Sequence, residues 1–197
     1  MKHLNVKAFS KLYKGVVSAH ICDESVAEMD TLKFQEHSFY NPVTKRNAPR
    51  SGSQELAMSW GYLPTKKELN KLVDDTAYQY VKELNMPWFT DYQGYSHVRF
   101  NKYAENKKMA LHADHIHSMF DGERKGIPIL TVLGVLNDDY EGGELKFVDG
   151  KVFKFKAGTN IIFRSDAYNS HQVLKVKKGK RYTIPSWYTT KLLFLTI

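Results

Sequence analysis

The stretch GELKFVDGKVFKFKAGTNIIF, residues 143–163, decides the fold class. It contains three short apolar runs, GELKFV, KVFKF and NIIF, and the residues that separate them are rich in Gly, Asp and Lys. Short runs of this kind, bounded by turn residues, are typical of strands joined by tight turns. The stretch therefore predicts a series of short β-strands.

The same pattern extends over the chain from about residue 90. Further strands are expected at 95–100, 129–137, 171–176 and 181–188. Before residue 90 the pattern is helical, weakly over 22–34 and clearly over 65–85, with a polar loop at 41–54 between the two. In the clear helix, apolar residues recur at helical spacing, Thr65 and Glu68 match a capping box, and Pro87 follows as a stop.

Helices followed by many short strands predict a jelly roll or barrel that helices brace on one face, a mainly β fold of the α+β class. Hydrophobic residues make up 42% of the chain and aromatic residues 13%, as in a folded globule. We expect one domain over 1–197, with helical support over about 1–90 and the jelly-roll core over about 91–197.

The chain is basic, with a formal net charge of +8. This surplus favours an acidic partner such as nucleic acid, a nucleoprotein, or an acidic protein or metabolite. A merely well-solvated surface explains the charge equally well, because net charge alone does not select a partner.

Cys22 is the single cysteine, which excludes an internal disulfide and a site of four thiolates. The amino terminus has no apolar run like that of a signal peptide. The least polar run, 127–136, is shorter than the roughly 20 residues of a membrane helix. We expect a soluble cytoplasmic protein with no membrane contact.

The segment LHADHIH, 111–117, is a candidate metal site. Alternate residues of an extended segment share a face, so His112 and Asp114 can bind one ion together. His115 points the opposite way, while His117 lies beyond the expected end of the strand and stays open as a ligand.

His171 far downstream sharpens this hypothesis. Two histidines and one carboxylate are the facial triad of non-haem Fe(II) oxygenases, which leaves coordination positions open for a co-substrate and dioxygen. A structural zinc site would instead be closed and usually richer in sulfur.

Arg181 begins the strand RYTIPSWY and shares one face with Thr183, Pro185 and Trp187. Burying a guanidinium is costly unless a carboxylate meets it, and a dicarboxylate co-substrate could supply that partner. The alternative is that Arg181 is one more charge in the basic run 175–181.

Together these residues resemble the Fe(II)/2-oxoglutarate dioxygenases, specifically the prolyl 4-hydroxylase-like branch. The resemblance covers roughly residues 95–190 and is carried by Tyr103, His112-Ala113-Asp114, LTVLGVLNDDYEGGELKF (130–147), KAGTNIIF (156–163), His171 and GKRYTIPSWY (179–188). A fainter match, RSGSQEL (50–56), is similar to the loop that closes over peptide in these enzymes.

The resemblance implies a double-stranded β-helix, another name for the jelly roll, with Fe(II), 2-oxoglutarate and O2 as cofactors and ascorbate as a reductant. The implied iron ligands are His112, Asp114 and His171. Arg181 and Tyr103 would bind the distal carboxylate of 2-oxoglutarate.

Other residues have weaker implied roles. Thr131 would assist in binding 2-oxoglutarate, and Trp187 would form a wall of the pocket. Arg50 and Ser51 would belong to the lid, although an ordinary polar loop is the alternative. Val135 departs from the family pattern, as does Met109, and both lie where the pocket is expected to meet substrate.

The implied function is hydroxylation of an unactivated C–H bond with release of succinate and CO2. The expected substrate is a prolyl residue of a protein or peptide, as for procollagen-proline 4-dioxygenase.

Alternatives within the fold are a small-molecule hydroxylase and a nucleic-acid dealkylase, although the latter usually has arginine where Trp187 stands. A non-catalytic jelly-roll binding module is the alternative of another class. The basic segment 175–181 could contact RNA or a ribosome. His115 and His117 either contact substrate or form a solvated rim.

Overall fold

The computed structural model describes residues 9–41, 43–48, 54–85, 94–115 and 127–190. The description below concerns these residues, and the lid residues Arg50 and Ser51, together with His117, lie outside them.

The larger sheet is antiparallel throughout. Its strands lie in the order β1 (Lys11–Tyr13), β13 (Thr159–Arg164), β9 (Ile127–Val135), β16 (Arg181–Thr190), β7 (Phe100–Tyr103), β5 (Ala57–Ser59) and β2 (Gln35–Glu36), with β6 (Gly94–Tyr95) also paired to β16.

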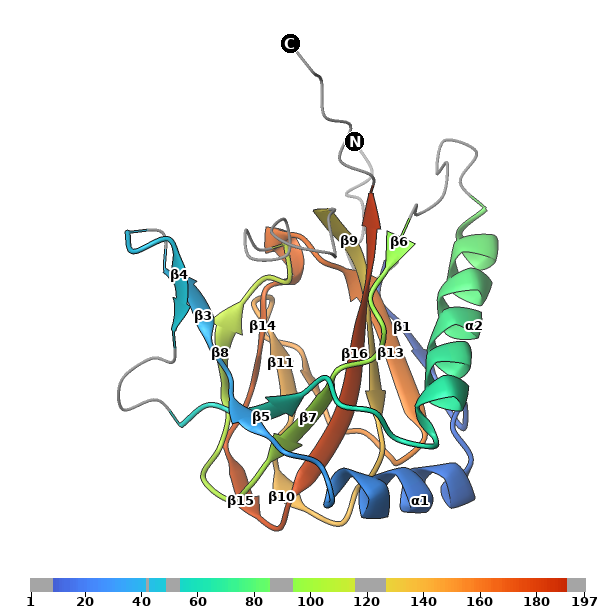
Figure 1. Cartoon of the computed structure of the whole chain (residues 1–197). Coiled ribbons are helices and arrows are strands. Elements are labelled where there is room, and N and C mark those ends of the chain that lie inside the picture. The colour runs from blue at the N-terminus through green and yellow to red at the C-terminus, as the bar shows by residue number, and fades with distance from the viewer. Residues whose placement is uncertain (1–8, 42, 49–53, 86–93, 116–126, 191–197) are drawn as a thin grey trace.

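The smaller sheet faces one side of the larger one (Figure 1). Its strands lie in the order β12 (Val152–Phe153), β11 (Leu145–Phe147), β14 (His171–Val173) and β8 (Met109–His112). Two further pairs complete the strands, namely β10 (Glu141–Gly142) with β15 (Val176–Lys178) and β3 (Phe39–Asn41) with β4 (Arg46–Ala48). Two antiparallel sheets packed face to face confirm the predicted jelly roll.

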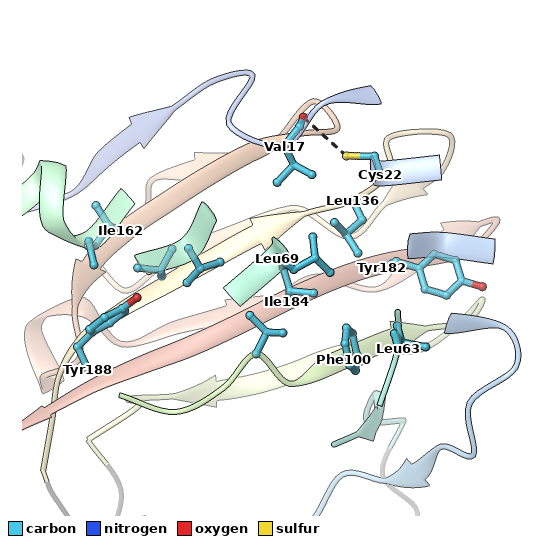
Figure 2. Close-up of a cluster of buried hydrophobic side chains, with 14 of the residues drawn as sticks. Val17, Cys22, Leu63, Leu69, Phe100, Leu136, Ile162, Tyr182, Ile184 and Tyr188 are labelled. Atoms are coloured by element: carbon cyan, nitrogen blue, oxygen red, sulfur yellow. Dashed lines mark hydrogen bonds between the residues drawn. The ribbon is translucent and has the colours of Figure 1, made fainter. Parts of the chain in front are cut away.

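Two helices, α1 (Ala19–Met29) and α2 (Lys66–Leu84), cover the other face of the larger sheet, where α2 packs against β13 and β9 (Figure 1). Figure 2 shows side chains of both helices and of β7, β13 and β16 meeting in one apolar layer. The single cysteine, Cys22, is buried in this layer, where its thiol donates to the Val17 carbonyl. A short 3-10 helix, η3 (Ala167–Asn169), precedes β14.

The period of two along a strand separates the core into two layers. On β16, Tyr182, Ile184 and Tyr188 belong to the helix-side layer. On β9, Leu133 and Val135 belong to the layer between the sheets, which also contains Phe147 of β11. The larger sheet is thus buried on both faces.

The predicted helix 22–34 was placed too late, because α1 begins at Ala19 and ends at Met29. The Ser18 side chain accepts a hydrogen bond from the Ile21 backbone N–H at 3.3 Å, which fixes the start. The predicted strand 95–100 was shifted, since β7 covers Phe100–Tyr103. The first ninety residues also contribute strands, including the hairpin β3–β4, which begins before the expected polar loop and extends into it.

The predicted capping box at Thr65 and Glu68 was wrong. Thr65 is the N-cap of α2, but its side chain makes no capping hydrogen bond. Its backbone N–H and hydroxyl instead donate to the carboxylate of Glu28 on α1, at 3.1 and 2.6 Å. The start of α2 is therefore held by the neighbouring helix, a contact between segments that local spacing does not reveal.

Within the described part of the chain, no helix combines the length and the apolar character that crossing a membrane would require.

Candidate active site

Two neighbouring strands of the smaller sheet bring the candidate ligands together. His112 ends β8 and His171 begins β14, and these two residues are paired across the antiparallel ladder. Their imidazole centroids lie 4.4 Å apart. Asp114 follows β8 after one residue, and one ligand atom from each of the three side chains lies within 4.8 Å of the others. This donor set of two imidazoles and one carboxylate suits Fe(II).

Backbone carbonyls fix the orientation of both imidazoles. Nδ1 of His112 lies 2.8 Å from the Ala110 carbonyl oxygen, and Nδ1 of His171 lies 3.0 Å from that of Asn169. A carbonyl only accepts, so each Nδ1 carries the proton and each Nε2 keeps its lone pair. Both Nε2 atoms point towards the Asp114 carboxylate, at 3.4 and 3.9 Å. Outer hydrogen bonds of this kind orient histidine ligands in metal sites.

The Asp114 carboxylate is supported by Thr131 on β9. The Thr131 hydroxyl donates to Oδ2 of Asp114 at 2.7 Å, and the Ser165 hydroxyl lies 2.9 Å from the Thr131 oxygen. Burial acts to raise the pKa of Asp114, but the two histidines and the hydroxyl outweigh burial and hold it well below its usual range. Asp114 is therefore a carboxylate at neutral pH, as a metal ligand must be.

His171 is also held in the form that binds metal. Burial lowers the pKa of His171 to about 4, against the opposing effect of the Asp114 carboxylate. Its imidazole is therefore neutral at pH 7, so metal binding does not have to displace a proton from it.

The three side chains open into a cavity between the sheets. Apolar side chains form much of its wall. The cavity is lined by Arg99, Asn101, Tyr103, Met109, His112, Asp114, Thr131, Leu133, Leu145, Phe163, His171, Val173, Pro185 and Trp187.

Arg181 lies beside this cavity with no exposed surface. Its guanidinium carbon is 4.9 Å from the centroid of the Tyr103 ring, and Arg181 is paired with Tyr103 in the β16–β7 ladder. None of its three guanidinium nitrogens has a hydrogen-bond partner among the described residues. A buried cation without such partners is costly, so the site fits a carboxylate ligand.

Gly143 gives Arg181 the space that it occupies. Gly143 has a φ of +66°, and a Cβ at this position would approach Cδ of Arg181 to 3.0 Å. The turn around Gly143 therefore needs glycine both for its backbone conformation and for close contact with the arginine.

The other predicted site residues have varied positions. Trp187 and Thr131 line the cavity, although the printed contact of Thr131 is with Asp114, and a contact of Thr131 with 2-oxoglutarate stays a prediction. Val135 is fully buried in the layer between the sheets and is not among the cavity-lining residues, which corrects its assignment to the substrate pocket. His115 is exposed.

Sequence analysis missed two cavity-lining residues, Arg99 and Asn101. Their signal is present, because Arg99, Asn101 and Tyr103 alternate along one extended segment and so share a face. The strand was expected to end at residue 100, one position before Asn101, so the alternation was not followed through to Tyr103.

Comparisons with known proteins agree with this geometry. Residues 98–189 match the family model of the 2OG-Fe(II) oxygenase superfamily. Prolyl 3-hydroxylase 2 from Homo sapiens is 42% identical over 70 residues, which are 32% of this chain and 10% of that protein. The match thus spans about a tenth of the length of that relative.

Solved structures share the fold over nearly the whole chain. A viral collagen prolyl hydroxylase from Paramecium Bursaria Chlorella virus-1, in complex with 2OG, has a TM-score of 0.65 and 17% identity, covering 93% of this chain and 96% of that one. A prolyl hydroxylase from Trichoplax adhaerens, in complex with a hypoxia inducible factor peptide, has a TM-score of 0.69 and 18% identity, covering 92% and 84%.

The family takes its name from 2-oxoglutarate and Fe(II), which it uses together with O2. The matched residues include the histidine and aspartate side chains that converge in this structure. The comparisons therefore support the assignment of residues 98–189 to a domain of the 2OG-Fe(II) oxygenase type.

Proposed function

We propose that the protein hydroxylates a prolyl residue of a protein or peptide, with Fe(II), 2-oxoglutarate and O2 as cofactors and release of succinate and CO2. The observation that carries this proposal is the convergence of two oriented imidazoles and a carboxylate beside a buried, unpaired arginine. The prolyl substrate is supported by the prolyl hydroxylases among the similar proteins.

In this mechanism, His112, Asp114 and His171 would hold the metal ion through two Nε2 atoms and one carboxylate oxygen. When bound there together with 2-oxoglutarate and O2, such an ion would supply the oxidising power for cleavage of the C–H bond. The protein supplies position and enclosure, because the Thr131 hydroxyl fixes the carboxylate and the apolar walls exclude water.

Arg181 and Tyr103 would bind the distal carboxylate of 2-oxoglutarate. The Arg181 guanidinium can form a bidentate pair with a carboxylate, and the Tyr103 hydroxyl can donate to the same group. Tyr103 lines the cavity whereas Arg181 lies beside the Tyr103 ring. We therefore propose that the ring shifts when the co-substrate enters.

The direct test is to incubate the protein with Fe(II), 2-oxoglutarate, ascorbate and a panel of proline-containing peptides. We expect succinate formation and peptides heavier by one oxygen atom on proline. Asp114→Ala should abolish both, whereas Glu141→Ala, which removes an exposed carboxylate on β10, should abolish neither. Succinate without any modified proline would contradict the prolyl assignment.

Hydroxylation at C4 of the ring is the finer proposal, from the resemblance to prolyl 4-hydroxylases. One similar protein is a prolyl 3-hydroxylase, so the product must be identified by comparison with authentic 3- and 4-hydroxyproline. A methylated oligonucleotide and free amino acids in the same assay would detect dealkylase or small-molecule activity.

Other expectations remain proposals of the same kind. We propose a single catalytic domain that acts in the cytoplasm and uses ascorbate to maintain activity over repeated turnovers. A contact of the basic segment 175–181 with RNA or a ribosome also stays a prediction. It requires binding that weakens steeply as salt is raised, because phosphate contacts release counterions.

A further inference from the structure

Arg99 is a cation in the cavity wall that the mechanism above does not use. It directly precedes β7, and its backbone N–H donates to the Pro185 carbonyl of β16 at 3.0 Å. The guanidinium carbon lies 4.8 Å from the centroid of the Trp187 ring, so the cation stacks on an aromatic side chain that also lines the cavity.

The contacts of Arg99 leave the two terminal amino groups of its guanidinium available for hydrogen bonds. Nε donates to the Asn101 side-chain oxygen at 2.9 Å, and the ring of Trp187 occupies one face of the guanidinium. Stacking uses the face of this planar group and leaves its edge for hydrogen bonds. Within the described ranges, no acidic side chain forms an ion pair with Arg99. Its two terminal amino groups are therefore free to hold an anion.

The charges of the groups around the cavity indicate which kind of anion Arg99 could bind. Among the residues that line the cavity, Asp114 is the single carboxylate, and its two oxygens face the histidines and Thr131. A ferrous ion and Arg181 together carry three positive charges, and Asp114 and the 2-oxoglutarate dianion carry three negative ones. Burial lowers the pKa of Arg99 to about 10, which still leaves it protonated at neutral pH. Among the cavity-lining residues, Arg99 thus adds a positive charge that Asp114 and the co-substrate do not neutralise.

We propose that Arg99 binds a carboxylate of the primary substrate, namely the side chain of an Asp or Glu close to the hydroxylated proline. This inference rests on the proposed function and extends it by naming an acidic class of peptide. The pre-stacked guanidinium would form a bidentate pair with that carboxylate at the metal end of the cavity. The same pair would hold the target residue in a fixed register against the ligands.

The test uses matched synthetic peptides with one central proline. In each peptide, one of the two positions before or the two positions after the proline carries Glu, Gln or Lys. Binding is followed by tryptophan fluorescence with Fe(II) and 2-oxoglutarate but without O2, so that nothing turns over. Trp187 can report binding at this site, because its ring contacts the Arg99 guanidinium. Hydroxylation of the same peptides is then measured in air.

For the wild type we expect a Glu peptide to bind about 10- to 100-fold more tightly than its Gln counterpart at one position, the range for a hydrogen bond to a charged group. Arg99→Gln should remove this preference, and Arg99→Lys should retain part of it. Arg99→Glu should instead favour the Lys peptide. A purely structural role of Arg99 would not reverse the charge preference.

The matched control is Lys102→Gln. Lys102 lies on β7, the strand that directly follows Arg99 in the chain. Its ammonium pairs with Asp30 at 2.7 Å, and it is not among the cavity-lining residues. This variant removes one positive charge at nearly the same place in the sequence and should keep the preference for Glu.

Three binding results would overturn the inference. The first is equal binding of all Glu and Gln peptides by the wild type, or no binding at all. The second is a Glu preference that survives in Arg99→Gln. The third is a loss of 2-oxoglutarate affinity in Arg99→Gln without a change in peptide preference, which would assign Arg99 to the co-substrate. Prolines hydroxylated without regard to acidic neighbours would refute this inference alone, whereas succinate formation with no modified proline would refute the proposed function.

Discussion

The two faces of β16 differ in the chemistry of their side chains. Tyr182, Ile184 and Tyr188 face the helices in an apolar layer, whereas Arg181 and Trp187 face the smaller sheet and the cavity. Burial of the first set is favourable by itself, because removal of apolar surface from water stabilises the fold by roughly 25 cal/mol per Å². The second set includes a guanidinium that burial destabilises. Because side chains alternate along the strand, one face of β16 contributes to stability and the other face contributes to the candidate site.

The largest effect is expected at the proposed metal ligands on the cavity side. Asp114→Ala removes the single carboxylate of the set and should reduce succinate formation by more than the roughly 100-fold that loss of a supporting contact costs. The fold should persist, because the helix-side layer is untouched, and circular dichroism would check this. An unfolded variant would show that the two faces are not separable.

On the helix side, Ile184→Ala should produce the opposite pattern. Ile184 is fully buried between the sheet and the helices, so truncation should lower the free energy of unfolding by about 2–5 kcal/mol. Chemical denaturation gives this value, and the folded fraction should retain the 2-oxoglutarate affinity of the wild type. A large loss of that affinity with little loss of stability would contradict the different roles of the two faces of β16.

The pH dependence of stability should arise on the cavity side. His171 has a pKa of about 4 in the folded protein and near 6.5 when unfolded, so the unfolded chain binds more protons between these values. Stability of the metal-free protein should be fully present above about pH 6.5 and fall towards pH 4, by up to about 3 kcal/mol.

Denaturation in a chelating buffer at several pH values measures this slope. His171→Gln should flatten it, while His20→Gln, at an exposed position on α1, should not. A slope that persists in His171→Gln would show that other groups cause it.

A smaller effect is expected for Thr131→Val, which keeps the shape but removes the hydroxyl that donates to Asp114. Metal affinity should fall about 10- to 100-fold, as for other contacts that support a metal ligand. Ser165→Ala, one hydrogen bond farther from Asp114, should weaken metal binding less. Equal losses in the two variants would contradict a specific role of the Thr131 hydroxyl.

Much of this architecture follows from the sequence. Alternation predicted that Arg181 and Trp187 share a face, and the repeat of apolar residues located α2 to within one residue at each end. Both features depend on local periodicity, which a single sequence displays directly.

Other features depend on contacts between distant segments. Glu28 holds the start of α2 through Thr65, and Thr131 reaches Asp114 from a different sheet. Arg99 belongs to the same class, because its significance comes from Trp187, far along the chain. A sequence pattern can indicate candidate residues for such contacts, but the tertiary fold determines which of these side chains lie together.

The Arg181 guanidinium, which has no hydrogen-bond partner among the described residues, has a consequence for the balance between stability and activity. Replacing it with methionine would leave an apolar side chain of similar length between the sheets, and such replacements of buried charges often raise stability. A screen for heat-resistant variants that ignores activity would therefore tend to select against this arginine. On the proposed function, stability and binding of the 2-oxoglutarate carboxylate therefore place opposite demands on this position.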